Sequence, residues 1–283
     1  MTQPILVTGA SGVLGRAIVT AFAEAGLVVR QAVRNLAKAK PGVDAVHLDY
    51  TEPATLAPAL AGIGGLLLMA PPLDPDAPAK VGPAVERATE AGVQHIVLIS
   101  AFGVNYNEQA PLRTIEHQVM DSGVPYTILR PNFFMENFSE GFLAGGIRGQ
   151  NGIFLAAGDG KTSFISVRDI AAAALAAFRK ALTGLEFDLS GAEALDHSEV
   201  ATVISEVSGR PVAYHPLSEE QMVAGARAAG VPEPAIGYMT VLYGVVRAGH
   251  AAAVTPDFER VTGRRPTTFR EFARANAAAW ELT

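Results

Sequence analysis

The chain has 283 residues, 49% of them apolar, and a formal net charge of −6 at pH 7. This length suits one large domain or a domain with a smaller companion. The acidic balance disfavours a nucleic-acid partner, and the absence of cysteine excludes disulfides, thiolate catalysis and Cys-ligated metals. Apolar runs are too short to span a bilayer and no targeting signal is visible, so we expect a cytoplasmic protein without a membrane partner.

A glycine-rich turn near the start of the chain is the most informative segment. Gly9, Gly12 and Gly15 follow an apolar strand pattern, and an amphipathic helix pattern comes directly after them. In such a unit the glycines permit a tight turn, a close approach of the backbone to phosphates and close packing of helix on strand. Free N–H groups and the positive end of the helix dipole face the anion. The segment predicts a dinucleotide pyrophosphate site, and the alternative is a glycine-rich turn without a ligand.

Strand and helix patterns alternate through the first half of the chain. The strand patterns lie at Ile5–Thr8, Val28–Val33, Val43–Leu48, Gly65–Met69, His95–Ser100 and Tyr126–Leu129. The helix patterns lie at Val13–Ala25, Thr55–Leu60, Val81–Ala91 and Leu112–Ser122. Several strands are apolar throughout, which is typical of parallel strands covered by helices on both faces. We therefore expect an α/β fold with a doubly wound parallel sheet of the Rossmann type.

The pattern changes after residue 150. Further strand patterns lie at Phe164–Val167, Glu186–Leu189 and Val212–His215. Capping signals open helices near Asp196, Ser218 and Thr268, the last helix being expected to carry Trp280. Asp169 is expected to cap an alanine-rich helix or to lie in its first turn. We expect a Rossmann domain over residues 1–190 and a smaller α+β cap over residues 191–283, although strands between 150 and 190 are free to return to the main sheet.

The end of the second strand indicates which nucleotide binds. Residues 32–35 lack the Asp or Glu that holds the ribose 2′-OH in NAD-preferring sites. Arg34 is positioned to pair with a 2′-phosphate through its planar guanidinium, so we expect NADPH/NADP as the cofactor. The alternative is a solvated surface arginine. Asp49, after the third strand, either accepts a hydrogen bond from the adenine amino group or belongs to a turn before a helix capped by Thr51.

Four segments, in the right order, resemble the NmrA-like, atypical short-chain dehydrogenase/reductases, and most closely the quinone oxidoreductase and triphenylmethane reductase members. They are Thr8–Gly15, Val33–Asn35, Val124–Asn137 and Ala157–Lys161. Residues 206–210 and 229–234 also match this subgroup, so the resemblance covers nearly the whole chain. It implies an NADP-binding Rossmann fold that reduces small conjugated or aromatic substrates.

The resemblance also implies a set of cofactor-binding residues. They are Gly9, Ser11, Gly12, Val13 and Leu14 at the pyrophosphate, Arg34 at the 2′-phosphate, Ala70 and Pro71 at the adenosine ribose, Ser100 near the nicotinamide, and Pro131, Asn132 and Phe133 against the nicotinamide ring. All of them follow predicted parallel strands, at whose carboxyl ends ligands bind in this fold class.

The segment that carries the proton relay in most short-chain dehydrogenases is different in this chain. The usual Tyr-x-x-x-Lys pair is missing, because Ala110 stands four residues after Tyr106 and the helix over residues 112–120 holds neither Tyr nor Lys. Tyr106 and Ser100 remain candidate catalytic residues, with water as another proton source. A site without a relay suits acceptors that take hydride first, such as quinones, iminium ions and cationic dyes, aligned by proximity and orientation.

Aromatic side chains near the predicted nicotinamide end suit a planar substrate, unless they belong to the core. The candidates are Phe102, Phe133, Phe134, Phe138 and Tyr238. No histidine spacing indicates a metal site, and no Gly-x-Ser-x-Gly elbow supports a hydrolase. We expect an NADPH-dependent oxidoreductase. The alternatives are a non-catalytic NADP(H) redox sensor and a biosynthetic iminium or ketone reductase, and the oligomeric state is left open.

Overall fold

The computed structural model describes residues 3–71 and 74–281, and its chain divides into two units. The first unit consists of Met1–Pro131, Val167–Leu189 and Asp257–Arg264. The second consists of Asn132–Ser166, Ser190–Pro256 and Arg265–Thr283. A single boundary between residues 190 and 191 therefore misplaces residues 132–166, Ser190 and residues 257–264, because the chain passes between the units several times.

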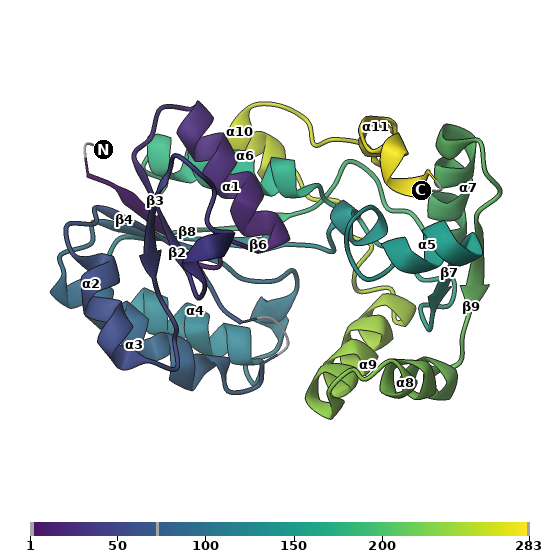
Figure 1. Ribbon diagram of the computed structural model, residues 1–283, viewed down its shortest axis with the longest axis horizontal. Coiled ribbons are helices and arrows are strands. Elements are labelled where there is room, and N and C mark those ends of the chain that lie inside the picture. Colours follow the sequence, from purple (N-terminus) through teal and green to yellow (C-terminus); the bar gives the residue numbers. More distant parts are fainter. Residues whose placement is uncertain (1–2, 72–73, 282–283) are drawn as a thin grey trace. The chain divides into compact units, whose positions relative to one another are not determined.

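Seven parallel strands form the sheet of the first unit, which confirms the doubly wound Rossmann-type fold (Figure 1). The strands are β1 (Ile5–Val7), β2 (Val29–Val33), β3 (Asp44–His47), β4 (Gly65–Met69), β5 (His95–Ile99), β6 (Tyr126–Pro131) and β8 (Leu185–Leu189). Their order across the sheet is β3-β2-β1-β4-β5-β6-β8, and every neighbouring pair is parallel. The order reverses between β1 and β4, and in this fold class such a reversal places a ligand crevice at the carboxyl ends of the strands.

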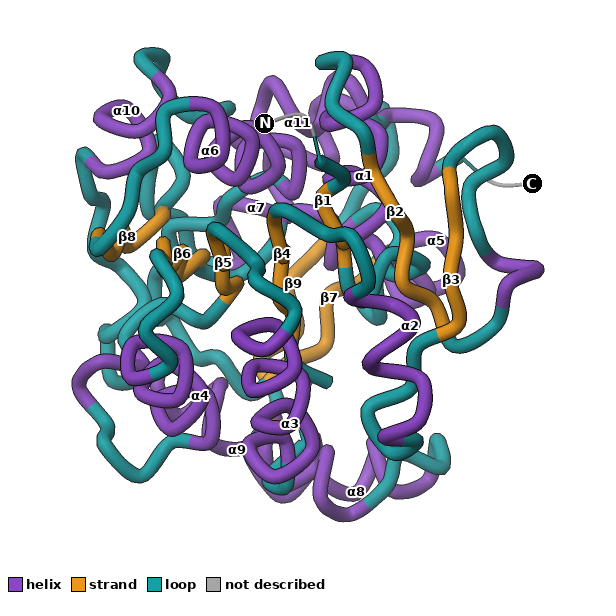
Figure 2. The backbone as a smooth tube through the Cα atoms, turned by 90° about the vertical axis from the view of Figure 1, so that its left-hand side faces the viewer, coloured by secondary structure: helices purple, strands orange, loops and turns teal. Residues whose placement is uncertain are grey.

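Helices cover both faces of this sheet, as its apolar strands require. One face carries α1 (Val13–Glu24), α6 (Val167–Arg179) and α10 (Asp257–Thr262), and the other carries α2 (Leu56–Leu60), α3 (Ala77–Glu90) and α4 (Pro111–Asp121), as Figure 2 shows. On the first face the rings of Phe22 and Phe178 meet edge to face, with centroids 5.7 Å apart. On the second face Leu66, Val81 and Ile115 belong to one buried cluster.

The second unit has a small sheet and an aromatic core. Its strands β7 (Gly152–Leu155) and β9 (Ala213–Pro216) form a parallel pair. Its helices are α5 (Ala144–Gln150), α7 (His197–Ser208), α8 (Glu219–Ala228), α9 (Glu233–Arg247) and α11 (Phe269–Ala275). Trp280 is fully buried, and its Nε1 donates to the Phe138 carbonyl at 2.7 Å. Trp280 lies in a short 3₁₀ turn after α11, so the expectation that the last helix carries it is wrong.

The pairing of β7 with β9 explains why residues 132–166 belong to the second unit. The contacts of α10 with α6 and β8 likewise explain why residues 257–264 belong to the first. The strand expected at Phe164–Val167 is absent: Ile165 makes only an isolated bridge to Phe134, and α6 begins at Val167. Asp169 lies in the first turn of α6, as one of the two expectations had it.

The three helix starts predicted from capping signals are confirmed. In each of α7, α8 and α11 the cap side chain accepts a hydrogen bond from the N3 backbone, and the N3 side chain accepts one from the cap backbone. The caps are Asp196, Ser218 and Thr268. This reciprocal arrangement satisfies N–H groups that a helix end otherwise leaves unpaired.

Candidate functional site

The glycine turn between β1 and α1 has the geometry of an anion cradle. Gly9 adopts a φ of +60°, which glycine alone adopts without strain. A Cβ on Gly15 would lie 2.2 Å from the Gly9 carbonyl oxygen, so the helix packs on the turn only because Gly15 has no side chain. Gly9 and Gly12 are exposed, and the helix has no cap side chain and no acidic residue in its first turn. Its first N–H groups and positive dipole end therefore suit a pyrophosphate.

The end of β4 forms the floor beside this turn. Thr8 Oγ1 accepts a hydrogen bond from the Met69 backbone N–H at 2.8 Å and so ties the end of β1 to the end of β4. Tyr50 donates its hydroxyl to the Met69 carbonyl at 3.0 Å. A Cβ on Gly9 would come within 3.5 Å of the Met69 side chain. Ala70, the next residue after β4, is half-buried beside this floor, in the place predicted for a ribose contact.

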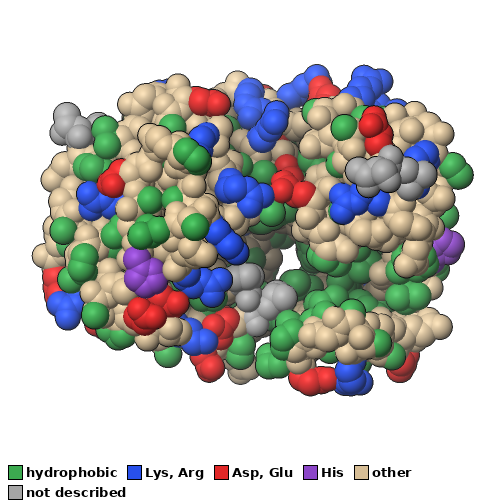
Figure 3. Space-filling view, in the orientation of Figure 1, with side chains coloured by type: hydrophobic (Ala, Val, Ile, Leu, Met, Phe, Trp, Pro, Cys, Tyr) green, Lys and Arg blue, Asp and Glu red, His purple; other side chains and the backbone are tan. Residues whose placement is uncertain are grey.

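Arg34 is exposed directly after β2, where the 2′-phosphate prediction needs it. The following residue, Asn35, accepts a hydrogen bond from the Ala37 backbone and starts a short 3₁₀ turn. This turn fixes the backbone immediately after Arg34 while leaving the guanidinium in solvent. Figure 3 shows several Lys and Arg side chains on the viewer's side of the first unit. The position is compatible with a phosphate ligand, and the cofactor role of Arg34 stays a prediction.

Asp49 has the turn geometry that was one of its two predicted roles. Its Oδ1 accepts hydrogen bonds from the Thr51 backbone at 2.9 Å and from the Thr51 hydroxyl at 2.7 Å. These bonds lower the pKa of Asp49, and the charge of Arg34 lowers it further. Thr51 does not cap α2, because that helix begins at Leu56 and the Thr55 hydroxyl bonds backbone groups of residues 49 and 52.

Ser100 and Tyr106, the two catalytic candidates, lie in contrasting surroundings. Ser100 directly follows β5, is only 7% exposed, and its backbone N–H donates to the Leu129 carbonyl of β6 at 2.8 Å. Tyr106 lies in a 3₁₀ turn (Val104–Tyr106), and 84% of its side chain is exposed. Exposed to this degree, the Tyr106 hydroxyl has no fixed direction, so the geometry lends it no support as a proton donor.

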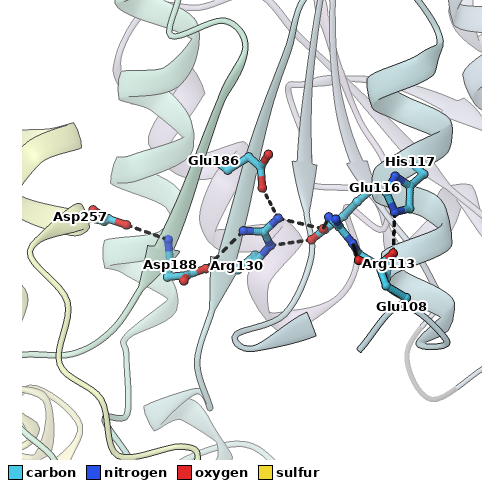
Figure 4. Close-up of polar contacts among 8 residues, drawn as sticks. All are labelled: Glu108, Arg113, Glu116, His117, Arg130, Glu186, Asp188 and Asp257. Atoms are coloured by element: carbon cyan, nitrogen blue, oxygen red, sulfur yellow. Dashed lines mark hydrogen bonds and ion pairs between the residues drawn. The ribbon is translucent and has the colours of Figure 1, made fainter. Parts of the chain in front are cut away.

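A buried network of charges surrounds Arg130, near the carboxyl end of β6, and takes its other members from α4 and β8 (Figure 4). Arg130 of β6 forms a bidentate ion pair with Glu116 of α4. Its Nε donates to Oε1 at 2.7 Å and its Nη2 donates to Oε2 at 2.9 Å. The same guanidinium bonds Glu186 and lies 3.5 Å from Asp188, both of β8. Arg113 adds a second cation, 2.8 Å from Glu116 Oε2. Such two-point pairing fixes orientation as well as distance.

Burial and charge pairing set the ionisation of this network. Burial on its own raises the pKa of Glu116, but the bonds from Arg130 and Arg113, together with the adjacent Ser100 hydroxyl, outweigh it and leave the pKa lowered. Glu116 is therefore an ionised carboxylate at neutral pH and not a proton donor. Burial raises the pKa of Asp188, which lies 3.5 Å from Arg130 on its β8 side. Ser100 lies beside Glu116, yet its Oγ has no hydrogen bond of standard geometry to any residue that the structure describes.

Asn132 and Phe133, the first residues of the second unit, follow directly after β6. The Asn132 amide is 4% exposed and donates to Ser163 Oγ at 2.7 Å and to the Ala251 carbonyl at 2.8 Å. Its Oδ1 accepts from the Phe133 backbone N–H at 3.0 Å, and the Phe133 carbonyl accepts from Ile165 at 2.9 Å. Both amide hydrogens of Asn132 are thus engaged inside the unit, and its Oδ1 accepts one bond. The side chain holds Phe133 in place and has only the second lone pair of Oδ1 left for another donor.

The predicted substrate residues separate into core and surface. Phe138 is fully buried, with its ring 5.1 Å from Phe164 and 5.4 Å from Phe269, so the prediction that it lines the substrate site is wrong. The reason is that apolar spacing shows an apolar face without showing what covers it. Phe133 is half-buried against the ring of Tyr243, 6.2 Å away, and Phe102, Phe134 and Tyr238 are also half-buried.

Helix α9, which carries Tyr238, exposes an apolar face. Val241 is 64% exposed and Val245, four residues later, is 36% exposed, and Figure 3 shows hydrophobic side chains gathered on this part of the second unit. Residues four apart lie on the same side of a helix, so the two valines form one stripe. An exposed apolar stripe of this kind suits contact with an apolar ligand.

Sequence reasoning missed the pairing of Glu116 with Arg130. The signal was present in Leu129-Arg130-Pro131, since an arginine inside a buried strand needs a carboxylate partner. The partner was not identifiable, because Glu116 lies fourteen residues away on a helix with several other polar residues. In residues 3–71 and 74–281 we find no group of three or more His, Asp or Glu residues arranged to hold a metal ion, and no helix long and apolar enough to cross a bilayer.

The parallel sheet with its glycine turn defines a dinucleotide-binding protein of the Rossmann class. Residues 1–273 match the model of the NmrA-like family, and the chain belongs to that family. It is 35% identical over 287 aligned residues to the NAD(P)H azoreductase of Xenophilus azovorans, covering 98% of this chain and 99% of that one.

Two solved structures have the same architecture over nearly their whole length. The triphenylmethane reductase of Citrobacter sp. has a TM-score of 0.85 at 26% identity, covering 97% of this chain and 99% of that one. The NADPH-dependent quinone oxidoreductase of Escherichia coli, solved with NADPH, has a TM-score of 0.82 at 26% identity, covering 96% and 99%. The expected resemblance to the quinone oxidoreductase and triphenylmethane reductase members is confirmed.

Proposed function

We propose that this chain is an NADPH-dependent oxidoreductase that transfers hydride to small conjugated acceptors, with quinones and azo compounds as the first classes to test. The observation that carries the proposal is the glycine turn between β1 and α1. The turn packs so closely on α1 that Gly15 has no room for a Cβ, and the start of the helix suits a pyrophosphate. The azoreductase, the triphenylmethane reductase and the quinone oxidoreductase support it, because each matches nearly the full length of the chain and bears a reductase or oxidoreductase name.

Arg34 supports NADPH over NADH. The guanidinium is exposed after β2, no carboxylate in residues 32–35 competes for a ribose 2′-OH, and the related quinone oxidoreductase was solved with NADPH. In this proposal the pyrophosphate contacts come from Gly9, Ser11, Gly12, Val13 and Leu14. Asp49 contributes less to cofactor binding, because Thr51 already donates two hydrogen bonds to the Oδ1 that would otherwise accept one from the adenine amino group.

The nicotinamide, when bound, supplies the hydride, and the protein's contribution is alignment. Pro131 and Phe133 are proposed to support the ring, with Asn132 acting through its hold on the Phe133 backbone. The remaining aromatic candidates for the acceptor site are Phe102, Phe134 and Tyr238. Glu116 is ionised and Tyr106 is turned out to solvent, so we propose that water supplies any proton the reduced acceptor needs.

The test is NADPH oxidation followed by absorbance, with purified protein and either a small quinone or an azo dye, and with NADH as the control. We expect protein-dependent turnover that prefers NADPH. NADPH binding is measured on the same sample. Binding without turnover of either acceptor would contradict a reductase of these classes and favour an NADP(H)-binding sensor, whereas a protein that does not bind NADPH would contradict the cofactor assignment itself.

A further inference from the structure

We infer that the Glu116–Arg130 ion pair is a positioning unit for hydride transfer, which holds Ser100 and the end of β6 in place in a chain that lacks the Tyr/Lys relay of other short-chain dehydrogenases. This inference rests on the proposed function. Neither residue is assigned a contact with cofactor or substrate. Both act through their neighbours, Ser100 on β5 and Pro131 on β6.

The strand register places the affected residues side by side. Ile99 of β5 pairs with Leu129 of β6, so the next step along both strands brings Ser100 level with Arg130. Side chains alternate between the faces of a sheet, and both of these side chains lie on the face covered by α4, where Glu116 meets them. One carboxylate therefore fixes the last residue positions of two adjacent strands, at the edge where ligands bind in this fold class.

Arg130 is held by three carboxylates from two elements, α4 and β8. Glu116 of α4 takes its Nε and Nη2, Glu186 of β8 takes Nη2, and Asp188 of β8 faces Nη1. Asp257 of α10 accepts in turn from the Asp188 backbone N–H at 3.0 Å, as Figure 4 shows. Arg130 is 4% exposed and Glu116 is fully buried. A planar guanidinium bonded on several sides is held in one orientation and anchors the end of β6, where Pro131 is fixed by its backbone pairing.

Stability alone does not explain this arrangement. Replacing a buried ion pair by apolar side chains of similar volume is often neutral or stabilising, because desolvation of the charges offsets their attraction. What the pair adds is fixed geometry beside Ser100, a residue only 7% exposed whose Oγ makes no standard hydrogen bond within the described chain. The Ser100 hydroxyl lies beside Glu116 and has no other described partner, which leaves it available to a ligand.

The test compares variants in two buried polar pairs, one between α4 and the carboxyl end of β6 and the other between the amino ends of β5 and β6. Glu116→Gln keeps the shape of the side chain but weakens the grip on Arg130 and Ser100. Thr127→Val removes the partner of His95 at the opposite ends of β5 and β6 and is the matched structural control. The measurements are the affinity for NADPH and the rate of hydride transfer to a quinone in a single turnover, both taken well below each variant's melting temperature.

We expect Glu116→Gln to slow hydride transfer by about tenfold or more while the Kd for NADPH stays within about threefold, because the nucleotide half of the site lies on other strands. Thr127→Val should leave the hydride rate within about twofold of the unsubstituted protein. A Glu116→Gln rate equal to that of the unsubstituted protein, or an equal loss in both variants, would overturn the inference.

Two further measurements keep the test decisive. If Glu116→Gln does not fold, the neutral double variant Glu116→Gln/Arg130→Met is expected to fold and to remain slow, and a normal rate in it would overturn the inference. If the unsubstituted protein reduces no quinone or azo dye, the proposed function fails first, and the fluorescence of bound NADPH decides the positioning role. Glu116→Gln must then change that emission while Thr127→Val does not, and unchanged emission in both would overturn the inference.

Discussion

Strands β5 and β6 carry a buried polar cluster at each end, and the two clusters are built on different principles. At the amino ends, His95 Nε2 lies 2.8 Å from the Thr127 hydroxyl, which bonds the Leu182 carbonyl in turn. At the carboxyl ends, Glu116 and Arg130 are charged and form part of a larger ionic network. The amino-end cluster holds a neutral histidine, since burial lowers the pKa of His95 to about 4.

The difference separates a cluster that stabilises the fold from a cluster that is arranged for ligand binding. In the neutral amino-end cluster, His95 bonds Thr127 and Thr127 bonds the Leu182 carbonyl. These bonds stay within the protein, so the cluster serves the packing of the strands. The carboxyl-end cluster keeps two desolvated charges in place and leaves the neighbouring Ser100 hydroxyl without a standard bond. Such an arrangement is costly for stability alone and useful for a ligand. Changes at the carboxyl edge should therefore act on binding and rate, and changes at the amino edge on stability.

The largest effect at the carboxyl edge is expected from Gly15→Ala. The new Cβ would lie 2.2 Å from the Gly9 carbonyl oxygen and 2.7 Å from Ala10 Cα, so the glycine turn must open. We expect the affinity for NADPH to fall by more than about 100-fold in a binding titration, a loss of about 3 kcal/mol or more. Gly145→Ala is the control, because that helical glycine in α5 has open space around it. Unchanged NADPH binding in Gly15→Ala would contradict the assignment of the glycine turn as the pyrophosphate site.

At the amino edge, acid should destabilise the fold through His95. Its folded-state pKa of about 4 lies below the ordinary 6.5, so the unfolded chain binds the proton more readily. The stabilisation that His95 contributes is present above pH 6.5 and is lost as the pH falls toward 4, by about 3 kcal/mol for this residue. Denaturant unfolding at several pH values measures it, and His95→Gln should flatten that part of the profile. An equally steep profile in His95→Gln would assign the acid sensitivity to other groups.

Arg34→Ala should have a smaller effect that is confined to one nucleotide. Loss of an exposed arginine facing a 2′-phosphate should raise the Kd for NADPH by about 30-fold, or about 2 kcal/mol, and leave the Kd for NADH within about threefold. Arg87→Ala removes an equally exposed arginine, paired with Glu90 on α3, and should change neither. Equal losses for both nucleotides in Arg34→Ala would contradict its assignment to the 2′-phosphate.

Much of the first unit was predictable because its signals are local. Apolar runs bounded by turns located all six strands expected in the first half, and the glycine spacing located the turn that Gly15 now explains. The strand order then predicts which edge of the sheet binds the ligand, because the carboxyl ends of parallel strands lie along one edge. The pairing of Glu116 with Arg130 could not be predicted, since it depends on how α4 packs against β6.

The second unit was harder to predict because its pairings are distant in sequence. The short strand β7 pairs with β9, some sixty residues later, and no local pattern indicates that partner. The apolar run Phe164–Val167 has the composition of a strand, but only Ile165 finds a bridge before α6 begins. Phe138 follows β6 at a position that favoured a substrate-lining role, but it lies in the core, where it packs against Phe164 and Phe269.

The most direct test of the account is the pH dependence of hydride transfer from NADPH to a quinone, measured in a single turnover from about pH 5.5 to about pH 9. We predict a rate that stays constant over this range, in the unsubstituted protein and in Tyr106→Phe alike. The reason is that Glu116 is already ionised, its pKa being lowered by Arg130, and that water supplies the proton. A rate that rises or falls with a single pKa, and that loses this dependence in Tyr106→Phe, would contradict the account and make that tyrosine the acid.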